Sequence, residues 1–370
     1  MQQKKTRTVT LGGYHGITKI SIGSGHPVTI QTMWKDGIAD VTEESEKLNQ
    51  IVREMNSLKM LGCDIIRFAV PDAESAGALR LIQSRTDIPL VADIHFDYKL
   101  ALACLDDSLP GTAPAAIRIN PGNIGSIDRV KCVVEACAKH GSAVRIGVNS
   151  GSLPKELQAQ VEEGKISRAQ ALAQAAIDEA SVFDSLGFKN VAVSIKASSV
   201  CETVEANRAF SALSDMPLHL GVTEAGPLIT GVVKSTLAFS TLLCQGIGNT
   251  IRVSLSSSPE NEVIAGREIL HECGLREGGV TLVSCPRCGR IGFDVHSFME
   301  RWQTELLSLK KNVTIAVMGC VVNGPGEGKH ADLGIAGGGD KVILFRKGKI
   351  IRTIPAKDAD IEFRKELELL

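Results

Sequence analysis

The chain has 370 residues, of which 44% are hydrophobic and 22% charged, and this length allows two or three domains with a full hydrophobic core. Its 41 basic residues balance 42 acidic ones, which excludes the broad basic surface of a nucleic-acid-binding protein. Residues 1–10 lack the apolar stretch of a signal peptide, and no apolar run is long enough to span a bilayer. With ten cysteines and no secretory signal, the chain is expected to be cytoplasmic, in a compartment that keeps thiols reduced.

Strand-like and helix-like segments alternate over the first two thirds of the chain. After a predicted strand pair at 9–11 and 17–22, short apolar runs predict strands at 28–32, 65–70, 90–94, 116–120, 143–148, 191–195, 218–222 and 251–255. Amphipathic helical spacing lies between them, and Asp40 (three residues before Glu43) and Pro227 are predicted helix starts. Eight strands alternating with helices predict a closed parallel (β/α)8 barrel of the TIM type over residues 1–273. A doubly wound sheet is the alternative, although it usually has fewer strands.

Polar residues follow the predicted barrel strands, and chemistry in this fold gathers at the strands' carboxyl ends. They are Arg67, Asp93, His95, Arg118, Asn120, Asn123, Arg145, Asn149, Lys196, Thr223, Glu224, Arg252 and Ser254. Cations from several strands that converge on one mouth need a polyanion, so we predict an anionic, phosphorylated small substrate. Two other interpretations stay open, since Asp93 with His95 could bind a metal and Lys196 could form a Schiff base.

Residues 274–370 have a different pattern, which predicts a small α+β domain. It contains a predicted helix at 295–307, strands at 313–317, 342–345 and 350–354, a tight turn at Lys347-Gly348, and a final amphipathic helix. The glycine-rich segment 334–339 is not followed by a helix, so it lacks the helix N-terminus of a phosphate-binding loop. We predict a turn there.

Two cysteine-containing segments of this domain predict a metal centre. Cys285 and Cys288 are three residues apart, and the segment 319–327 adds Cys320 and, at its far end, Glu327. The Cys-x-x-Cys spacing alone suits zinc and iron–sulfur equally. Three thiolates and a carboxylate depart from the usual ligands of structural zinc and suit an iron–sulfur cluster with one replaceable ligand. The other cysteines are expected to be structural, on apolar faces or at helix ends: Cys63, Cys104, Cys132, Cys137, Cys201, Cys244 and Cys273.

Motifs in both parts of the chain resemble one enzyme family. They are Val-Ala-Asp-Ile-His-Phe at 91–96, Ile-Arg-Ile-Asn-Pro-Gly-Asn at 117–123, Arg-Ile-Gly-Val-Asn-Ser-Gly-Ser-Leu at 145–153, Gly-Val-Thr-Glu-Ala-Gly at 221–226, and the run from Cys320 to Glu327. With these the chain resembles, over its whole length, the compact bacterial form of the 4-hydroxy-3-methylbut-2-en-1-yl diphosphate synthase family, which serves the methylerythritol phosphate route to isoprenoids.

The resemblance implies a [4Fe-4S] cluster held by Cys285, Cys288, Cys320 and Glu327. It implies an iron–sulfur oxidoreductase that opens 2-C-methyl-D-erythritol 2,4-cyclodiphosphate to (E)-4-hydroxy-3-methylbut-2-enyl diphosphate by reductive dehydration. Reduced flavodoxin or ferredoxin would supply the electrons. The family is also homodimeric, with the cluster domain of one subunit closing the barrel of the other.

The site residues follow from matching these motifs to this chain. The diphosphate is expected to bind residues matching Arg67, Arg118, Arg145 and Lys196, and further substrate contacts are expected from Asp93, Asn120, Asn149, Thr223, Arg252, Ser254 and Asn323. Glu224 and His95 are the candidates for moving the proton that leaves with water. Glu327 is expected to exchange with a substrate oxygen.

Overall fold

The computed structural model describes residues 3–109, 111–286, 292–321, 324, 326 and 328–370. The chain divides into two compact units, residues 1–276 and 277–370, close to the boundary expected after residue 273. Among the described residues no helix is both long and apolar enough to cross a membrane.

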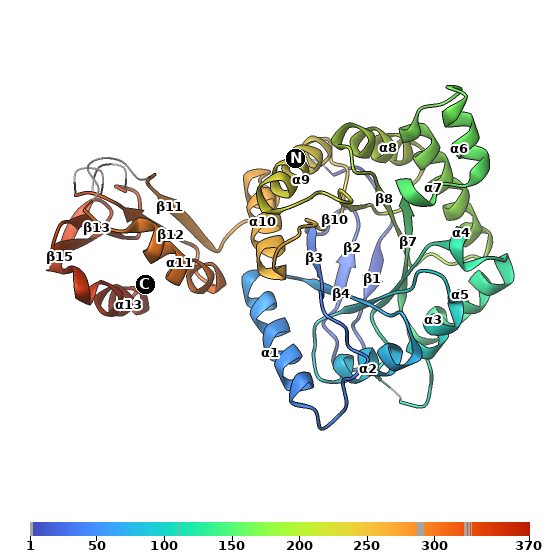
Figure 1. Ribbon diagram of the computed structural model, residues 1–370, viewed down its shortest axis with the longest axis horizontal. Coiled ribbons are helices and arrows are strands. Elements are labelled where there is room, and N and C mark those ends of the chain that lie inside the picture. The colour runs from blue at the N-terminus through green and yellow to red at the C-terminus, as the bar shows by residue number, and fades with distance from the viewer. Residues whose placement is uncertain (1–2, 110, 287–291, 322–323, 325, 327) are drawn as a thin grey trace. The chain divides into compact units, whose positions relative to one another are not determined.

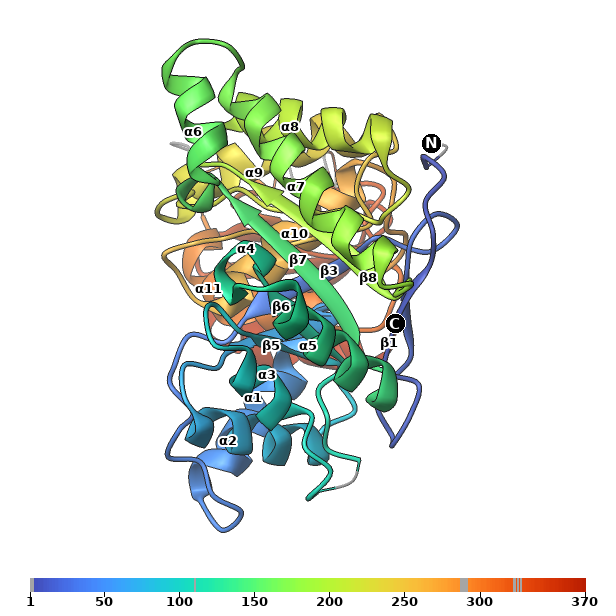
Figure 2. The same ribbon diagram turned by 90° about the vertical axis from the view of Figure 1, so that its right-hand side faces the viewer.

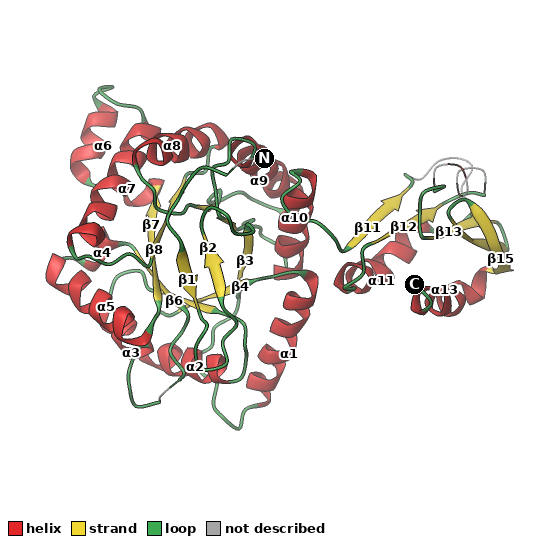
Figure 3. Ribbon diagram, turned by 180° about the vertical axis from the view of Figure 1, so that it is seen from behind, coloured by secondary structure: helices red, strands yellow, loops and turns green. Residues whose placement is uncertain are grey.

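The first unit is built around a barrel of parallel strands, which Figures 1 and 3 show enclosed by helices. Its strands are β3 (Thr29–Met33), β4 (Ile65–Ala69), β5 (Leu90–Asp93), β6 (Ala116–Ile119), β7 (Ala143–Asn149), β8 (Val191–Lys196), β9 (His219–Leu220) and β10 (Thr250–Ile251). They pair in the order β8-β7-β6-β5-β4-β3-β10-β9, and a parallel bridge from Val193 to Leu218 joins the two ends of this sheet. The closed barrel is therefore confirmed over the doubly wound sheet.

The barrel helices occupy the connections between strands. They are α1 (Glu46–Leu61), α2 (Ala73–Ser84), α3 (Tyr98–Cys104), α4 (Pro121–Ile124), α5 (Ile127–His140), α6 (Lys155–Glu162), α7 (Arg168–Ser185), α8 (Val200–Leu213), α9 (Leu228–Leu243) and α10 (Pro259–Glu272), with a 3-10 turn at Ser150–Ser152. Figure 2 shows α7 lying along β7 and β8, which it contacts.

Helix starts were the least accurate part of the sequence prediction. Helix α1 begins at Glu46, where Ser45 is the N-cap and its side chain accepts a hydrogen bond from the Leu48 amide. The start predicted at Asp40 is wrong, because that carboxylate instead pairs with Lys47 2.5 Å away. Pro227 is the N-cap of α9 rather than its first helical residue.

An antiparallel strand pair, β1 (Val9–Leu11) and β2 (Ile20–Ile22), covers the amino-terminal end of the barrel. Its apolar side chains share a buried cluster with Ile65, Ala116 and Ala143, each the first residue of its strand. Because this end is filled with apolar side chains, polar groups of the interior can meet a ligand only from the carboxyl ends of the strands.

The second unit is a sheet with helices on one face. Its strands pair in the order β11 (Val280–Ser284), β12 (Val313–Met318), β13 (Leu333–Gly338), β14 (Lys341–Arg346) and β15 (Lys349–Pro355). Its helices α11 (Val295–Ser308) and α13 (Ala359–Glu368), the latter after a 3-10 turn at Ala356–Asp358, bury Phe298, Trp302 and Phe363 against this sheet. The α+β domain is as predicted, and positive φ angles at Lys347 and Gly348 confirm the turn between β14 and β15.

The glycine-rich segment of this unit corrects the sequence analysis. Residues 333–338 form β13, the middle strand of the sheet, where a turn was expected, and β11 was not predicted. A Cβ on Gly334 would lie 2.1 Å from the Phe345 ring, and one on Gly337 would lie 2.0 Å from Phe293 Cβ. These glycines therefore leave space for aromatic side chains rather than allowing the chain to turn.

Candidate active site

Five cationic side chains lie in or directly after the barrel strands. They are Arg67 on β4, Arg118 on β6, Arg145 on β7, Lys196 on β8 and Arg252 after β10, and each residue is at most 8% exposed. Charges buried in this way are destabilising unless opposite charges or hydrogen bonds compensate them. Asp93 and Glu262 are the carboxylates that the structure pairs with them. The barrel therefore holds more positive than negative buried charge.

Asp93, the last residue of β5, lies between two of these arginines. Its carboxylate is 3.1 Å from Arg118 Nη1, 3.5 Å from Arg67 Nε and 3.4 Å from His95 Nε2. Burial alone would raise the pKa of Asp93, but Arg67, His95 and Arg118 outweigh it and lower that pKa far below its usual range. Asp93 is therefore a carboxylate that orients two arginines and a histidine, and it is too acidic to act as a proton donor.

Two glycines on the barrel wall make room for cationic side chains. A Cβ on Gly147 of β7 would lie 2.3 Å from Arg118 Nε, and one on Gly221, after β9, would lie 2.7 Å from Lys196 Cε. Any other residue would displace those side chains. Burial, with the neighbouring arginines, lowers the pKa of Lys196 well below its ordinary value. An anion bound beside Lys196 would neutralise part of the positive charge of these neighbouring arginines.

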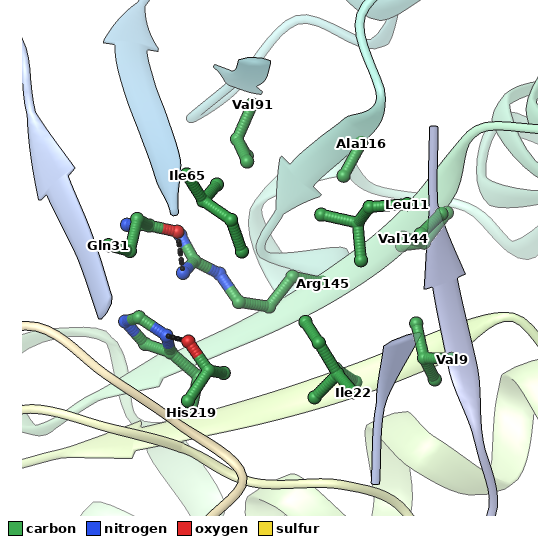
Figure 4. A pocket seen from close by; sticks show the side chains of 13 residues that line it. Val9, Leu11, Ile22, Gln31, Ile65, Val91, Ala116, Val144, Arg145 and His219 are labelled. Atoms are coloured by element: carbon green, nitrogen blue, oxygen red, sulfur yellow. Dashed lines mark hydrogen bonds between the residues drawn. The ribbon is translucent and has the colours of Figure 1, made fainter. Parts of the chain in front are cut away.

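Arg145 lies deeper in the barrel than the sequence analysis placed it. It is in the first half of β7, where its Nη1 donates to Gln31 Oε1 at 2.8 Å, and the other lining side chains include His219 (Figure 4). Nε and Nη2 of Arg145 and Nε2 of His219 have no hydrogen-bond partner among the described residues. Burial lowers the pKa of His219 well below its ordinary value, so its imidazole is neutral. Arg145 therefore retains donors for a further acceptor.

The remaining predicted residues lie nearer the carboxyl ends of the strands. His95 and Glu224 are exposed, Thr223, Asn149 and Ser254 are half-buried, and Asn120 is buried. With its amide oriented to satisfy its neighbours, Asn149 accepts a hydrogen bond from Arg118 Nη2 at 3.1 Å. Glu224 has a φ of +51°, a left-handed conformation that is strained for a residue with a side chain and is frequent at functional sites.

Two residues of this region, Glu262 and Lys35, were not predicted from the sequence. Glu262, on α10, is 1% exposed, and its carboxylate accepts hydrogen bonds from Thr32, Lys35, Arg252 and the Leu255 amide. The sequence signal was weak, because an acidic residue in the first turn of a helix is ordinary.

In the second unit, two predicted ligands lie at one edge of the sheet. Cys285 directly follows β11, and Cys320 comes two residues after the neighbouring parallel strand β12. The Gly319 amide donates to Cys285 Sγ at 3.0 Å, and Cys320 is 7% exposed. Hydrogen bonds to sulfur are among the features that tune iron–sulfur clusters, so these two residues fit such a group. Cys288, Asn323 and Glu327 lie outside the described residues, and the described part of the chain contains no group of three or more potential metal ligands.

The structural role expected for the other cysteines holds for some of them. Cys63, Cys104 and Cys137 are buried, and burial raises the pKa of Cys63 and Cys104 to about 12. Cys201 and Cys244 are exposed near helix ends. Cys132 contradicts the expectation, because it is exposed in the interior of α5.

Comparison with known proteins covers both units. The model of the GcpE TIM-barrel domain matches residues 14–267, and that of the GcpE protein C-terminal domain matches residues 281–369. The 4-hydroxy-3-methylbut-2-en-1-yl diphosphate synthase (flavodoxin) of Treponema pallidum is 54% identical over 99% of this chain and 92% of its own length. The enzyme of the same name from Clostridium perfringens is 42% identical over the full length of both chains.

Among solved structures, the type I 3-dehydroquinate dehydratase of Clostridium difficile aligns with 73% of this chain and 97% of its own. Its TM-score of 0.47 and identity of 17% are too low to inform function. The family models and the full-length relatives are decisive, and the chain belongs to the GcpE family of 4-hydroxy-3-methylbut-2-en-1-yl diphosphate synthases.

Proposed function

We propose that this chain converts 2-C-methyl-D-erythritol 2,4-cyclodiphosphate to (E)-4-hydroxy-3-methylbut-2-enyl diphosphate. The reaction opens the cyclic diphosphate, takes up two electrons and two protons, and releases one water. It makes the chain an oxidoreductase of isoprenoid precursor biosynthesis, the activity for which its full-length relatives are named.

The observation that carries the proposal is the excess of buried positive charge in the barrel. Among the described residues, the five cations share two carboxylates, Asp93 and Glu262, which pair with three of them. Arg145 has further N–H groups without a partner among these residues. A diphosphate supplies both the negative charge and the acceptor oxygens that this arrangement lacks. As the ring opens, the same cations stabilise charge that develops on the diphosphate.

We infer that two residues at the carboxyl ends of the strands move protons in this reaction. The side chain of His95 is 53% exposed, and its Nε2 lies 3.4 Å from Asp93 and 3.2 Å from Arg118. Glu224 is exposed and held in a strained conformation directly after Thr223. We assign Glu224 and His95 to the proton that leaves with water, and Asn120, Asn149, Thr223, Ser254 and Asn323 to substrate contacts.

The ligands of the proposed [4Fe-4S] cluster are Cys285, Cys288, Cys320 and Glu327. When bound, the cluster supplies electrons one at a time to a substrate whose C–O bonds do not break by acid–base chemistry alone. The chain's part is to present thiolates from two neighbouring strand ends, with the Gly319 amide donating to Cys285 Sγ. Glu327 would be the one oxygen ligand beside three thiolates, and it would therefore be the ligand that is replaced most readily.

The electron donor is proposed to be flavodoxin, which the names of the relatives include, rather than ferredoxin. We also propose a homodimer in which each active site uses the barrel of one subunit and the cluster domain of the other. Its support is the family resemblance and the short connection, residues 273–279, between α10 and β11.

The test is turnover by anaerobically purified protein with reduced flavodoxin and the cyclodiphosphate, followed by phosphorus NMR. We expect the signals of the cyclic diphosphate to be replaced by those of a linear diphosphate. An Arg118→Ala protein with an unchanged cluster spectrum is the matched control and should turn over far more slowly. Failure of the wild-type protein to consume substrate, with the iron–sulfur absorption intact, would contradict the proposal.

A further inference from the structure

Glu262 is a buried carboxylate to which the proposed chemistry gives no role, yet it contacts several elements of the barrel mouth. Its Oε1 accepts from Arg252 Nη2 at 3.0 Å and from the Leu255 amide at 3.0 Å. Its Oε2 accepts from Thr32 Oγ1 at 2.8 Å and from Arg252 Nε at 3.3 Å, and Lys35 Nζ lies 2.5 Å from Oε1. One carboxylate thus joins α10 to β3 and to the residues that follow β10, the last strand of the barrel in chain order.

We propose that Glu262 is the positioning residue for Arg252, and that it fixes the orientation in which this guanidinium meets the substrate's diphosphate. The inference rests on the proposed function, because it requires a diphosphate in the barrel.

The hydrogen bonds explain how the orientation is fixed. Glu262 accepts hydrogen bonds from Nε and Nη2 of Arg252, which lie along one edge of the guanidinium plane. This bidentate contact sets the direction of that plane. Two of the five N–H groups are used, and the others point away from the carboxylate. Thr32, Lys35 and the Leu255 amide also contact the Glu262 carboxylate, and these contacts keep it from rotating.

The negative charge of Glu262 and its positioning of Arg252 have opposite effects on anion binding, so the role of Glu262 can be measured. Replacement by Gln removes a negative charge beside Arg252 and Lys35, and by Coulomb's law this alone strengthens the binding of an anion. Loss of the charge-assisted contacts also frees Arg252 to leave its orientation, which weakens binding. Gln has one acceptor oxygen, and its NH2 group would face a donor of Arg252, so we expect the loss of orientation to dominate. The sign of the change distinguishes the two roles.

The experiment is calorimetric titration of the cluster-loaded protein with the cyclodiphosphate in the absence of reductant, so that binding is measured without turnover. Glu262→Gln should weaken binding about three- to tenfold, whereas Arg252→Ala should weaken it at least about tenfold. In the double variant, Glu262→Gln should add no weakening, since the group that it positions is gone. Thr32→Val removes one neutral hydrogen bond to the same carboxylate and leaves both contacts with Arg252, so it should weaken binding less than Glu262→Gln does.

Thermal melting should show every variant folded, and in turnover assays Glu262→Gln should raise KM by the same factor while changing kcat less. Unchanged or tighter binding by Glu262→Gln, together with weakened binding by Arg252→Ala, would overturn the positioning role alone. Equal weakening by Glu262→Gln in the wild-type and Arg252→Ala backgrounds would also overturn it, because a general structural effect adds. If Arg252→Ala binds like wild type, Arg252 is outside the diphosphate site, and the inference falls with that part of the proposed function.

Discussion

Replacing Gly147 by Ala tests whether the barrel wall sets the position of Arg118. The new Cβ would lie 2.3 Å from Arg118 Nε, 2.4 Å from Nη2 and 2.7 Å from Cζ. Ordinary contacts between such atoms are about 3.5 Å or more, so the guanidinium has to move by roughly 1 Å. That movement is enough to break its 3.1 Å contact with Asp93 and its alignment with a bound phosphate.

The expected loss is that of one charge-assisted hydrogen bond, about 1.5–3 kcal/mol, or roughly ten- to a hundredfold in the dissociation constant of the cyclodiphosphate. Calorimetry on the cluster-loaded protein without reductant measures it. The matched control is Gly77→Ala on the exposed side of α2, where no heavy atom lies within 4 Å of the added Cβ. This control should bind as wild type and be slightly more stable. Binding by Gly147→Ala within twofold of wild type would refute the reasoning.

Four further predictions address the cluster, pH and assembly. Cys320→Ala should lose most bound iron while the barrel stays folded, and full iron content by elemental analysis would exclude Cys320 as a ligand. Glu327→Cys should keep the cluster but lower turnover by orders of magnitude, since substrate oxygen must displace a thiolate, and near wild-type turnover would contradict this. Burial raises the pKa of Glu179 to about 7, so the folded protein holds a proton that the unfolded chain releases near pH 4.5. The free energy of unfolding should therefore fall as pH rises from about 4.5 to 7. Glu179→Gln should remove that slope and, in denaturant unfolding, stabilise the protein at pH 8 by up to about 3 kcal/mol. An unchanged slope would assign the pH dependence to another group. Mixed Cys320→Ala and Arg145→Ala proteins, with subunit exchange verified, should recover about a quarter of wild-type activity if sites are shared between subunits, and none if each site lies within one chain.

The barrel could be predicted because its strands are buried on both faces and are therefore read as continuous apolar runs. Six of the eight strands lie within about one residue of the predicted bounds. The exceptions are β9 and β10, which each contain two residues, His219–Leu220 and Thr250–Ile251, although their apolar runs are longer. Apolar composition identifies the segment that enters the barrel, whereas hydrogen bonding to the neighbouring strands determines how much of it is strand.

Two of the failures come from contacts between elements, which the local sequence does not record. The segment 334–339 is predicted to be a turn because no helix follows it, but Gly334 lies in β13, and the Phe345 ring on the adjacent strand occupies the space of its missing Cβ. The sequence does not identify Glu262, because an acidic residue near a helix start is ordinary and its contact with Thr32 joins residues 230 positions apart. No local pattern records either contact, so both had to come from the structure.

The cations of the barrel could be identified from the sequence, but their depth and pairing could not. Burial and the neighbouring arginines lower the pKa values of Arg145 and Lys196 well below their usual range, so these side chains are costly to keep charged inside the barrel. Asp93 and Glu262 offset part of the cost of burying the other arginines by pairing with them. We expect a diphosphate bound among these cations, reached from the carboxyl ends of the strands, to offset more of that cost. The buried charge that is unfavourable for folding should therefore contribute to the free energy of binding an anionic substrate.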